Sequence, residues 1–138
     1  MRTAVYFLSR KGSSRAVAEA IAKAASCKCE PLLPAYMPDY LDLVFLGCEG
    51  RRADSVTLQF IGSLKPTRVR ACALYVCGKE NGVALAQMRR ALNDRGIRVL
   101  RQTFVAPCAG LFSKGPGQAD LERAKQFCLD SIGQIQEG

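Results

Sequence analysis

The chain contains 138 residues, of which 49% are hydrophobic and 23% are charged. This length and balance favour a single soluble domain, residues 1–138, with a substantial apolar core. No apolar run reaches the ~20 residues that a membrane-spanning helix needs, so we expect no membrane span and no membrane partner. The chain also starts without a secretory signal pattern, and we therefore expect a cytoplasmic location.

Histidine is absent from the chain, whereas cysteine occurs seven times and the net charge is +8. Because histidine is the commonest general base and metal ligand, we expect no metal site, and any chemistry would belong to a cofactor. Cysteines in a chain without an export signal are expected to be reduced thiols. The basic residues are scattered and match no nucleic-acid-binding pattern, so we expect no nucleic-acid partner.

Five apolar segments have the composition of β-strands, and they cover residues 3–8, 27–32, 42–48, 69–77 and 97–106. The second is short and weak. The third is a continuous apolar run that stops at Gly47 and the polar residues after it. Glycine and proline residues separate these runs, which is typical of strand ends.

Four other segments place apolar residues at helical spacing, and they carry the pairs Val17 and Ile21, Phe60 and Ile61, Leu85 and Met88, and Ala124 and Cys128. Asp54 or Ser55 is expected to cap the second of these helices. Gly96 is expected to end the third. Residues 109–118 are rich in glycine, proline and serine and are expected to form a loop before the last helix.

Strands and helices therefore alternate along the chain. The central strands are apolar on both faces, which is typical of parallel strands covered by helices on both sides. Right-handed crossovers between such strands build a doubly wound sheet. We therefore predict an α/β fold with a five-stranded parallel sheet and helices on both of its faces.

The segment from Ser9 to Ser14, called the first loop below, joins the first strand to the first helix. Such a junction directs backbone N–H groups and the positive end of a helix dipole at one point, which favours a phosphate. Arg10 and Lys11 would add positive charge, and the serines would add hydrogen-bond donors. The alternative is that Ser13 or Ser14 only caps the helix.

In these features the chain resembles the flavodoxin family in its short-chain form. Ser9-Arg10-Lys11-Gly12-Ser13-Ser14 is similar to the family's loop Ser-x-Thr-Gly-Asn-Thr, and residues 42–48 and 70–82 look like its third strand and its fourth strand with the following flavin loop. The resemblance implies the strand order 2-1-3-4-5, with FMN at the carboxyl ends of the strands where the order reverses. The FMN phosphate would lie in the first loop, and the isoalloxazine ring between the second and third loops.

The resemblance also implies three groups of cofactor-binding residues. The phosphate would be held by Ser9, Arg10, Lys11, Gly12, Ser13 and Ser14. One side of the flavin would be bordered by Gly47, Cys48, Glu49 and Gly50, and the other side by Gly78, Lys79, Glu80, Asn81 and Gly82. The glycines would let the backbone approach the ring closely. The alternative is that they only form turns.

These assignments predict an FMN-binding electron-transfer protein, a carrier rather than an enzyme with its own substrate, that meets a redox partner protein. Residues 47–54 and 77–82 contain no aromatic side chain to stack on a flavin. Phe112, in the loop before the last helix, would be either a substitute or a hydrophobic anchor that folds this loop onto the body. Two alternatives stay open. One is a binding or regulatory module of the same fold that has lost FMN, and the other is a small FMN-dependent reductase.

The charges of these loops predict that the partner is acidic. The loops contain seven basic side chains, which are Arg10, Lys11, Arg15, Arg51, Arg52, Lys79 and Lys114. They contain three acidic side chains, which are Glu49, Asp54 and Glu80.

Three cysteines, Cys48, Cys77 and Cys108, fall at the ends of the third, fourth and fifth strands. Neighbouring strands lie about 4.8 Å apart, so these thiols are expected to line one edge of the sheet. We expect them to be small packing residues, because free cysteine behaves as a small apolar residue. The alternative is a thiol redox site or a metal site.

Overall fold

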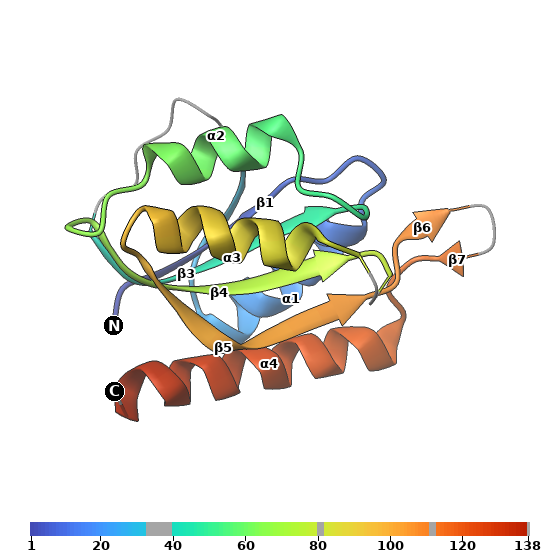
Figure 1. Ribbon diagram of the computed structural model, residues 1–138. Coiled ribbons are helices and arrows are strands. Elements are labelled where there is room, and N and C mark those ends of the chain that lie inside the picture. The colour runs from blue at the N-terminus through green and yellow to red at the C-terminus, as the bar shows by residue number, and fades with distance from the viewer. Residues whose placement is uncertain (33–39, 80–81, 111–112, 138) are drawn as a thin grey trace.

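The computed structural model describes residues 1–32, 40–79, 82–110 and 113–137 (Figure 1). Its centre is a five-stranded parallel sheet in the order β2-β1-β3-β4-β5. The strands are β1 (Thr3–Phe7), β2 (Cys29–Pro31), β3 (Leu41–Glu49), β4 (Val69–Cys77) and β5 (Arg98–Ala106). The strand order expected from the sequence is therefore confirmed.

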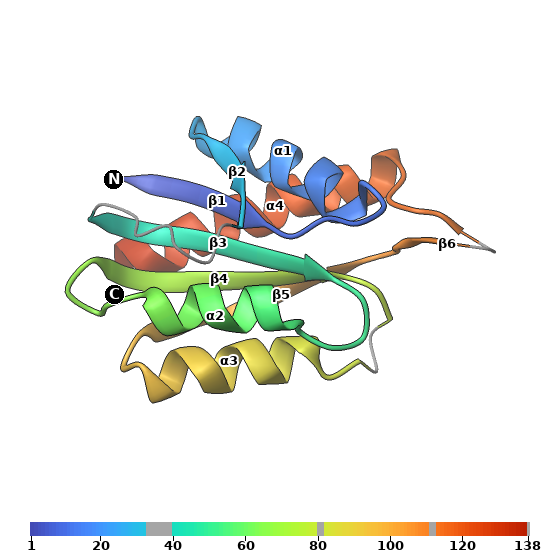
Figure 2. The same ribbon diagram turned by 90° about the horizontal axis from the view of Figure 1, so that it is seen from above.

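Helices cover both faces of this sheet. Figure 2 shows α1 (Ser13–Ala25) and α4 (Gln118–Glu137) on one face, and α2 (Ser55–Ser63) and α3 (Ala84–Asp94) on the other. The predicted α/β fold is confirmed. None of the helices among the described residues combines the length and apolar composition that crossing a membrane requires.

Two apolar cores follow from this arrangement, one on each face of the sheet. Phe45 and Phe127 pack edge to face between the sheet and α4, with ring centroids 5.8 Å apart. Tyr6 and Phe60 pack against each other on the side of α2, with centroids 5.0 Å apart. The central strands β3 and β4 contribute buried side chains to both cores, as strands covered on two faces must.

The strand β3 contains Gly47 and ends at Glu49, one residue beyond the predicted segment 42–48. Gly47 is accommodated inside the strand by the neighbouring strand β4, where the buried Tyr75 pairs with it. A Cβ atom at Gly47 would lie 2.1 Å from the Tyr75 ring, so the ring fills the space of the missing side chain. Successive side chains alternate between the faces of a strand, so Glu49 lies on the same face as Phe45 and Gly47, which is the face of α1.

The expected helix boundaries at Asp54 and Gly96 are also confirmed. Asp54 is the N-cap of α2, and its side chain accepts a hydrogen bond from the Thr57 amide at 2.9 Å. Gly96 follows α3 with a φ of +75°, a conformation that a residue without a Cβ adopts at little cost. The sequence signals for the start and end of these helices therefore predicted the local structure correctly.

The segment predicted to be an irregular loop after β5 contains two short antiparallel strands, β6 (Ala109–Gly110) and β7 (Ser113–Lys114). They project beyond the carboxyl ends of the sheet strands (Figure 1). Strands of two residues carry no detectable alternation, so the composition predicted only a loop. Phe112, the substitute for a flavin-stacking aromatic, lies outside the described residues.

Candidate functional site

The first loop surrounds a carboxylate that belongs to the chain itself. Glu49, at the end of β3, is buried with 7% of its surface exposed. Its Oε2 accepts hydrogen bonds from the backbone amides of Arg10 and Lys11 at 2.7 and 3.0 Å. Its Oε1 accepts from the Ser14 amide at 2.8 Å and the Ser9 hydroxyl at 2.7 Å. Four donors of the first loop are therefore engaged by one side chain.

The electrostatics of this contact favour the ionised carboxylate. Burial by itself raises the pKa of Glu49, but the hydrogen bonds from Ser14, Arg10, Ser9 and Lys11 outweigh burial and lower it below its ordinary value. The amino end of α1 adds the positive end of a helix dipole, which favours an anion at the same place. Glu49 is therefore an ionised carboxylate that four hydrogen-bond donors of the first loop hold in place.

The other serine hydroxyls of the first loop also have partners within the protein. The Ser14 hydroxyl donates to the carbonyl oxygen of Leu8. The Ser13 hydroxyl oxygen accepts from the amide of Ala109 at 2.8 Å, which ties the start of β6 to α1. The alternative that Ser13 or Ser14 caps the helix is wrong, because the N-cap of α1 is Gly12 and no side chain caps it.

Gly12 provides the turn that brings these groups together. Its φ of +85° is strained for residues with a side chain, and its amide donates to the Ser9 hydroxyl oxygen at 3.0 Å. Ser9 thus receives one hydrogen bond while it donates another to Glu49. The predicted phosphate-binding residues are therefore brought together, and four of them donate to Glu49: Ser9, Arg10, Lys11 and Ser14.

The second and third loops, described at residues 50–54 and at residues 78, 79, 82 and 83, lie against each other, and we call them the paired loops. The amide of Gly50 donates to the carbonyl of Cys77 at 2.9 Å. A Cβ atom at Gly78 would lie 2.9 Å from the carbonyl oxygen of Gly50, and one at Gly82 would lie 3.1 Å from that of Arg51. These glycines permit the close approach of one loop to the other.

Further hydrogen bonds join the paired loops near α3. The carbonyl of Arg51 accepts from the amides of Val83 and Ala84 at 2.8 and 2.9 Å. The amide of Ala53 donates to the side-chain oxygen of Gln87 at 2.7 Å. Of the residues predicted to border a flavin, Gly50 and Gly78 therefore meet directly, and Gly82 lies against Arg51. The predicted residues Glu80 and Asn81 lie outside the described residues.

Two of the residues predicted to border a flavin have other surroundings. Gly47 lies beneath the Tyr75 ring, and Cys48 is fully buried in the core on the side of α2 and α3. Cys77 and Cys108 pack into the opposite core, on the side of α1 and α4. The expectation that three thiols line one edge is therefore wrong, because alternation along the strands separates Cys48 from the other two.

Burial also keeps the thiols of Cys48 and Cys77 protonated. It raises the pKa of Cys48 to about 12, and it raises the pKa of Cys77 even more strongly. The thiolate is the reactive form of cysteine, so these positions suit packing better than redox chemistry. No cluster of three or more potential metal-ligating side chains occurs in the part of the chain that the structure describes.

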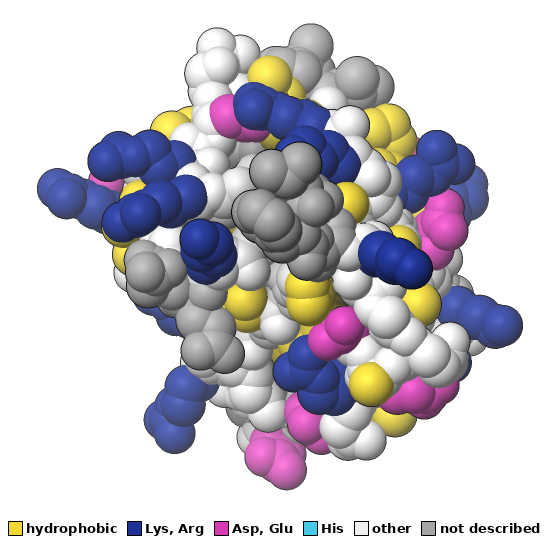
Figure 3. Space-filling model, turned by 90° about the vertical axis from the view of Figure 1, so that its right-hand side faces the viewer, with side chains coloured by type: hydrophobic (Ala, Val, Ile, Leu, Met, Phe, Trp, Pro, Cys, Tyr) yellow, Lys and Arg dark blue, Asp and Glu magenta, His cyan; other side chains and the backbone are white. Residues whose placement is uncertain are grey.

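Basic side chains surround this edge of the molecule. Figure 3 looks onto the edge and shows Lys and Arg side chains over much of it. Arg10 pairs with Asp54 at 3.1 Å, and Arg15 pairs with Glu19 at 3.0 Å. The other basic residues of the edge are exposed and make no ion pair with any described residue: Lys11, Arg51, Arg52, Lys79 and Lys114.

This geometry does not fit the FMN that the family resemblance implies. A phosphate in the first loop would need the donors that Glu49 already occupies, and it would lie against a like charge. An isoalloxazine between the second and third loops would have to separate backbones that contact each other at Gly50 and Gly78. The donors of the first loop are hydrogen-bonded to Glu49, and the second and third loops contact each other at Gly50 and Gly78.

Several solved structures that are similar to this chain are flavodoxins. A flavodoxin from the domain Archaea has a TM-score of 0.72 at 15% identity, over 99% of both chains. A short-chain flavodoxin associated with a PDU bacterial microcompartment has a TM-score of 0.73 at 14% identity, over 98% of this chain and 99% of that one. Oxidised flavodoxin 2 from Bacillus cereus has a TM-score of 0.69 at 12% identity, over 97% and 99%.

No family model and no curated protein matches the sequence. At the low identities of the structural matches, the likeness establishes the fold. It confirms the flavodoxin-like architecture that the first loop and the strand pattern predicted.

Proposed function

We propose that this chain is a binding module with the flavodoxin fold, that it works without FMN, and that it docks an acidic protein partner through the edge at the carboxyl ends of its strands. The observation that carries the proposal is the hydrogen bonding of Glu49 by the first loop. The donors that would face a cofactor phosphate face inward to this carboxylate. The basic side chains of the same edge face outward.

The charge of the edge supports an acidic partner. Glu49 is buried beneath the loop, so it does not present its charge to an incoming surface as an exposed carboxylate would. Arg51 and Arg52 are exposed neighbours in the second loop, and the exposed Lys79 lies in the third. Exposed charges of one sign steer association with a surface of the opposite sign, and salt weakens the effect.

Electron transfer by bound FMN is the second candidate function. The structural likeness to flavodoxins over nearly the whole chain favours it. In this case Glu49 would have to leave the first loop and the paired loops would have to separate. A carrier of this kind would also dock a redox partner through the same edge.

A flavin titration distinguishes the two candidates. The purified protein is titrated with FMN and with riboflavin, which lacks the phosphate, and the quenching of flavin fluorescence is followed. We expect neither flavin to bind, because the first loop is occupied and the paired loops are in contact. Binding of FMN that is much tighter than that of riboflavin would support the electron carrier and contradict the module without FMN.

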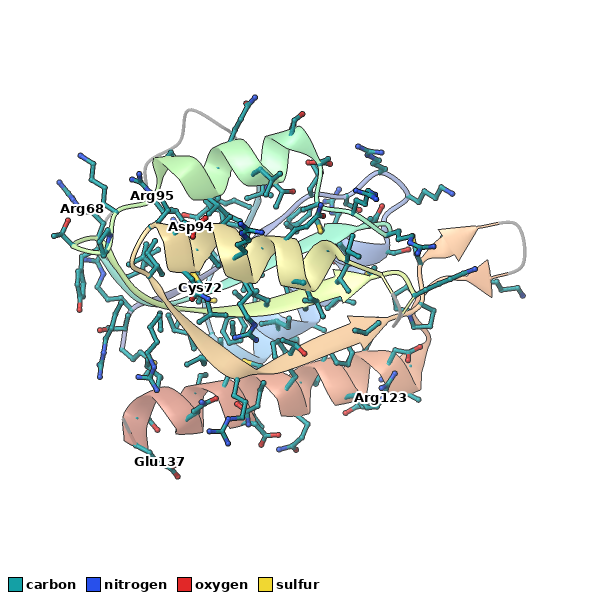
Figure 4. All side chains as sticks on the ribbon, in the orientation of Figure 1. Arg68, Cys72, Asp94, Arg95, Arg123 and Glu137 are labelled. Carbon is teal, nitrogen blue, oxygen red and sulfur yellow. The ribbon has the colours of Figure 1, made fainter. Side chains whose placement is uncertain are left out.

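Docking is tested with poly-L-glutamate as an acidic probe. The double substitution Arg51→Glu and Arg52→Glu is expected to weaken binding by about tenfold at low salt, and added salt should remove most of the difference. The control is Arg68→Glu with Arg98→Glu, which makes the same change in net charge. Arg68 lies at the opposite end of the molecule (Figure 4), and Arg98 begins β5 at its amino end. Equal weakening by both pairs would show that only net charge matters and would contradict docking at this edge.

A further inference from the structure

The first loop of this protein is ordered by a group that occupies the place of a ligand. Backbone amides from Arg10, Lys11 and Ser14 point at a single anion, with a serine hydroxyl beside them. This donor set at the amino end of a helix is the kind that holds phosphate groups. Here both oxygens of the Glu49 carboxylate fill it.

We infer that Glu49 is an internal substitute for a phosphate group, which orders the first loop and excludes phosphate monoesters from it. This inference rests on the proposed function without FMN and names the residue responsible for the exclusion. It also assigns to Glu49 a role that differs from the flavin-bordering position predicted from the sequence.

The backbone around Glu49 keeps its carboxylate in place. Glu49 is a member of β3 and pairs in register with Cys77 of β4. The next residue, Gly50, turns the chain with a φ of +103°, and its amide donates to the Cys77 carbonyl at 2.9 Å. The main chain is therefore fixed on both sides of Glu49. Release of the carboxylate would require a change of side-chain rotamer toward solvent or movement of the strand end.

A phosphate from solution competes poorly with Glu49 for the donors of the first loop. Glu49 is covalently attached at the site, so it acts at a high effective concentration that a dissolved ligand does not match. A phosphate that entered without displacing it would meet a buried negative charge. We therefore expect the intact protein to bind neither inorganic phosphate nor FMN through the first loop.

The variant Glu49→Ala tests the inference, with inorganic phosphate as the probe. The substitution removes the carboxylate and leaves the donors of the first loop without a partner. Isothermal titration should show that the variant binds phosphate at least about tenfold more tightly than the unsubstituted protein. The matched control is Glu19→Ala, which removes a negative charge from the exposed face of α1, where Glu19 pairs with Arg15. It should bind phosphate as weakly as the unsubstituted protein.

Equal phosphate binding by the folded Glu49→Ala variant and the unsubstituted protein would overturn the inference. The inference would also be overturned if Glu49→Ala and Glu19→Ala strengthened phosphate binding equally, because the effect would then come from the change in net charge.

Amide resonances of the unsubstituted protein give a second measurement, which does not depend on the folding of the variant. The inference predicts that tens of millimolar phosphate leaves the resonances of Arg10, Lys11 and Ser14 unchanged, and that these amides exchange slowly with solvent. Phosphate-dependent shifts at these three amides would show that the loop is open to anions and would overturn the inference.

Failure of this inference and failure of the proposed docking are distinguishable. If the two arginine double variants weakened the binding of poly-L-glutamate equally, the docking proposal would fail, and the result for Glu49 would still stand. Phosphate binding by the unsubstituted protein would remove the exclusion role of Glu49 and leave docking at the basic edge intact.

Discussion

The first loop and the paired loops lie at the same edge of the sheet, but they are closed in different ways. In the first loop, one carboxylate satisfies four donors. In the paired loops, backbone lies directly against backbone, and glycines leave the necessary room. The first closure depends on a single side chain, whereas the second depends on the shape of the main chain. A single substitution should therefore reopen the first loop, whereas no single truncation of a side chain should separate the paired loops.

The largest loss of stability is expected at Gly47, where the ring of Tyr75 packs directly against the backbone of the glycine. The substitution Gly47→Ala places a Cβ atom 2.1 Å from the Tyr75 ring, which is fully buried. Overpacking of a buried site costs about 1–3 kcal/mol, and the absence of free space puts this case at or above the upper end. Urea unfolding monitored by circular dichroism measures the loss.

The matched control for this change is Gly62→Ala in α2. A Cβ atom there would meet nothing within 4 Å, and alanine is favoured over glycine inside a helix by about 0.5–1 kcal/mol. We therefore expect Gly62→Ala to be neutral or stabilising. Similar losses of stability in the two variants would show that close packing against Tyr75 does not explain the glycine at position 47.

The next largest effect is expected for Glu49→Gln, which tests the closure of the first loop. The amide of glutamine retains one acceptor oxygen and points N–H groups at the donors of the loop. The loss of charged hydrogen bonds and the unpaired donors should cost about 2 kcal/mol at neutral pH. Urea unfolding should show this difference, and the exposed Glu19→Gln change should show almost none.

The pH dependence of this difference identifies the carboxylate as its cause. The pKa of Glu49 is lower in the folded protein than its ordinary value of 4.5, so the unfolded chain takes up the proton first as the pH falls. Glu49 therefore contributes its full stabilisation above about pH 4.5 and loses it as the pH falls through the lower folded value. The gap between the unsubstituted protein and Glu49→Gln should narrow over this acid range. A difference in stability between the two proteins that stays constant over this pH range would contradict the conclusion that the ionised Glu49 carboxylate causes it.

These two regions also show what the sequence could and could not predict. The apolar runs predicted the strands, and the cap at Asp54 predicted the start of α2, because both signals are local. The predicted segment 42–48 ends one residue before β3 does, because the charged Glu49 does not continue an apolar run. Only the neighbouring Tyr75, which fills the space beside Gly47, explains why a glycine stands inside this strand.

The position of Glu49 follows from that longer strand. Alternation from Phe45 through Gly47 places Glu49 on the face of α1 and Cys48 on the face of α2. A count by twos along β3 would therefore have placed the carboxylate at the first loop and would have separated Cys48 from the other two thiols. The contact between the paired loops could not be predicted in this way, because it depends on backbone conformation at glycines that are far apart in the sequence.

A smaller effect is expected at Asp54, which connects the two regions through its side chain. Asp54 caps α2 at the Thr57 amide and pairs with Arg10 across the edge. Loss of an N-cap costs about 1 kcal/mol, so Asp54→Ala should lower the stability by this amount. The variant Asp54→Asn keeps an acceptor for the cap and should recover most of the loss, as measured by thermal unfolding. A failure of Asp54→Asn to recover stability would assign the loss to the ion pair instead.

The smallest effect is expected for Arg10→Ala, because the two parts of Arg10 have different roles. Its backbone amide donates to Glu49 at 2.7 Å and remains after the substitution. Its side chain is 69% exposed and pairs with Asp54 at 3.1 Å, and exposed ion pairs contribute about 0.2–1 kcal/mol. We expect Arg10→Ala to lower the free energy of unfolding by an amount near the lower end of this range, and high salt should abolish the difference. A double-mutant cycle of Arg10→Ala with Asp54→Ala measures the coupling between the two side chains. A coupling well above 1 kcal/mol that survives high salt would show that this ion pair, and not Glu49 alone, holds the first loop against the paired loops.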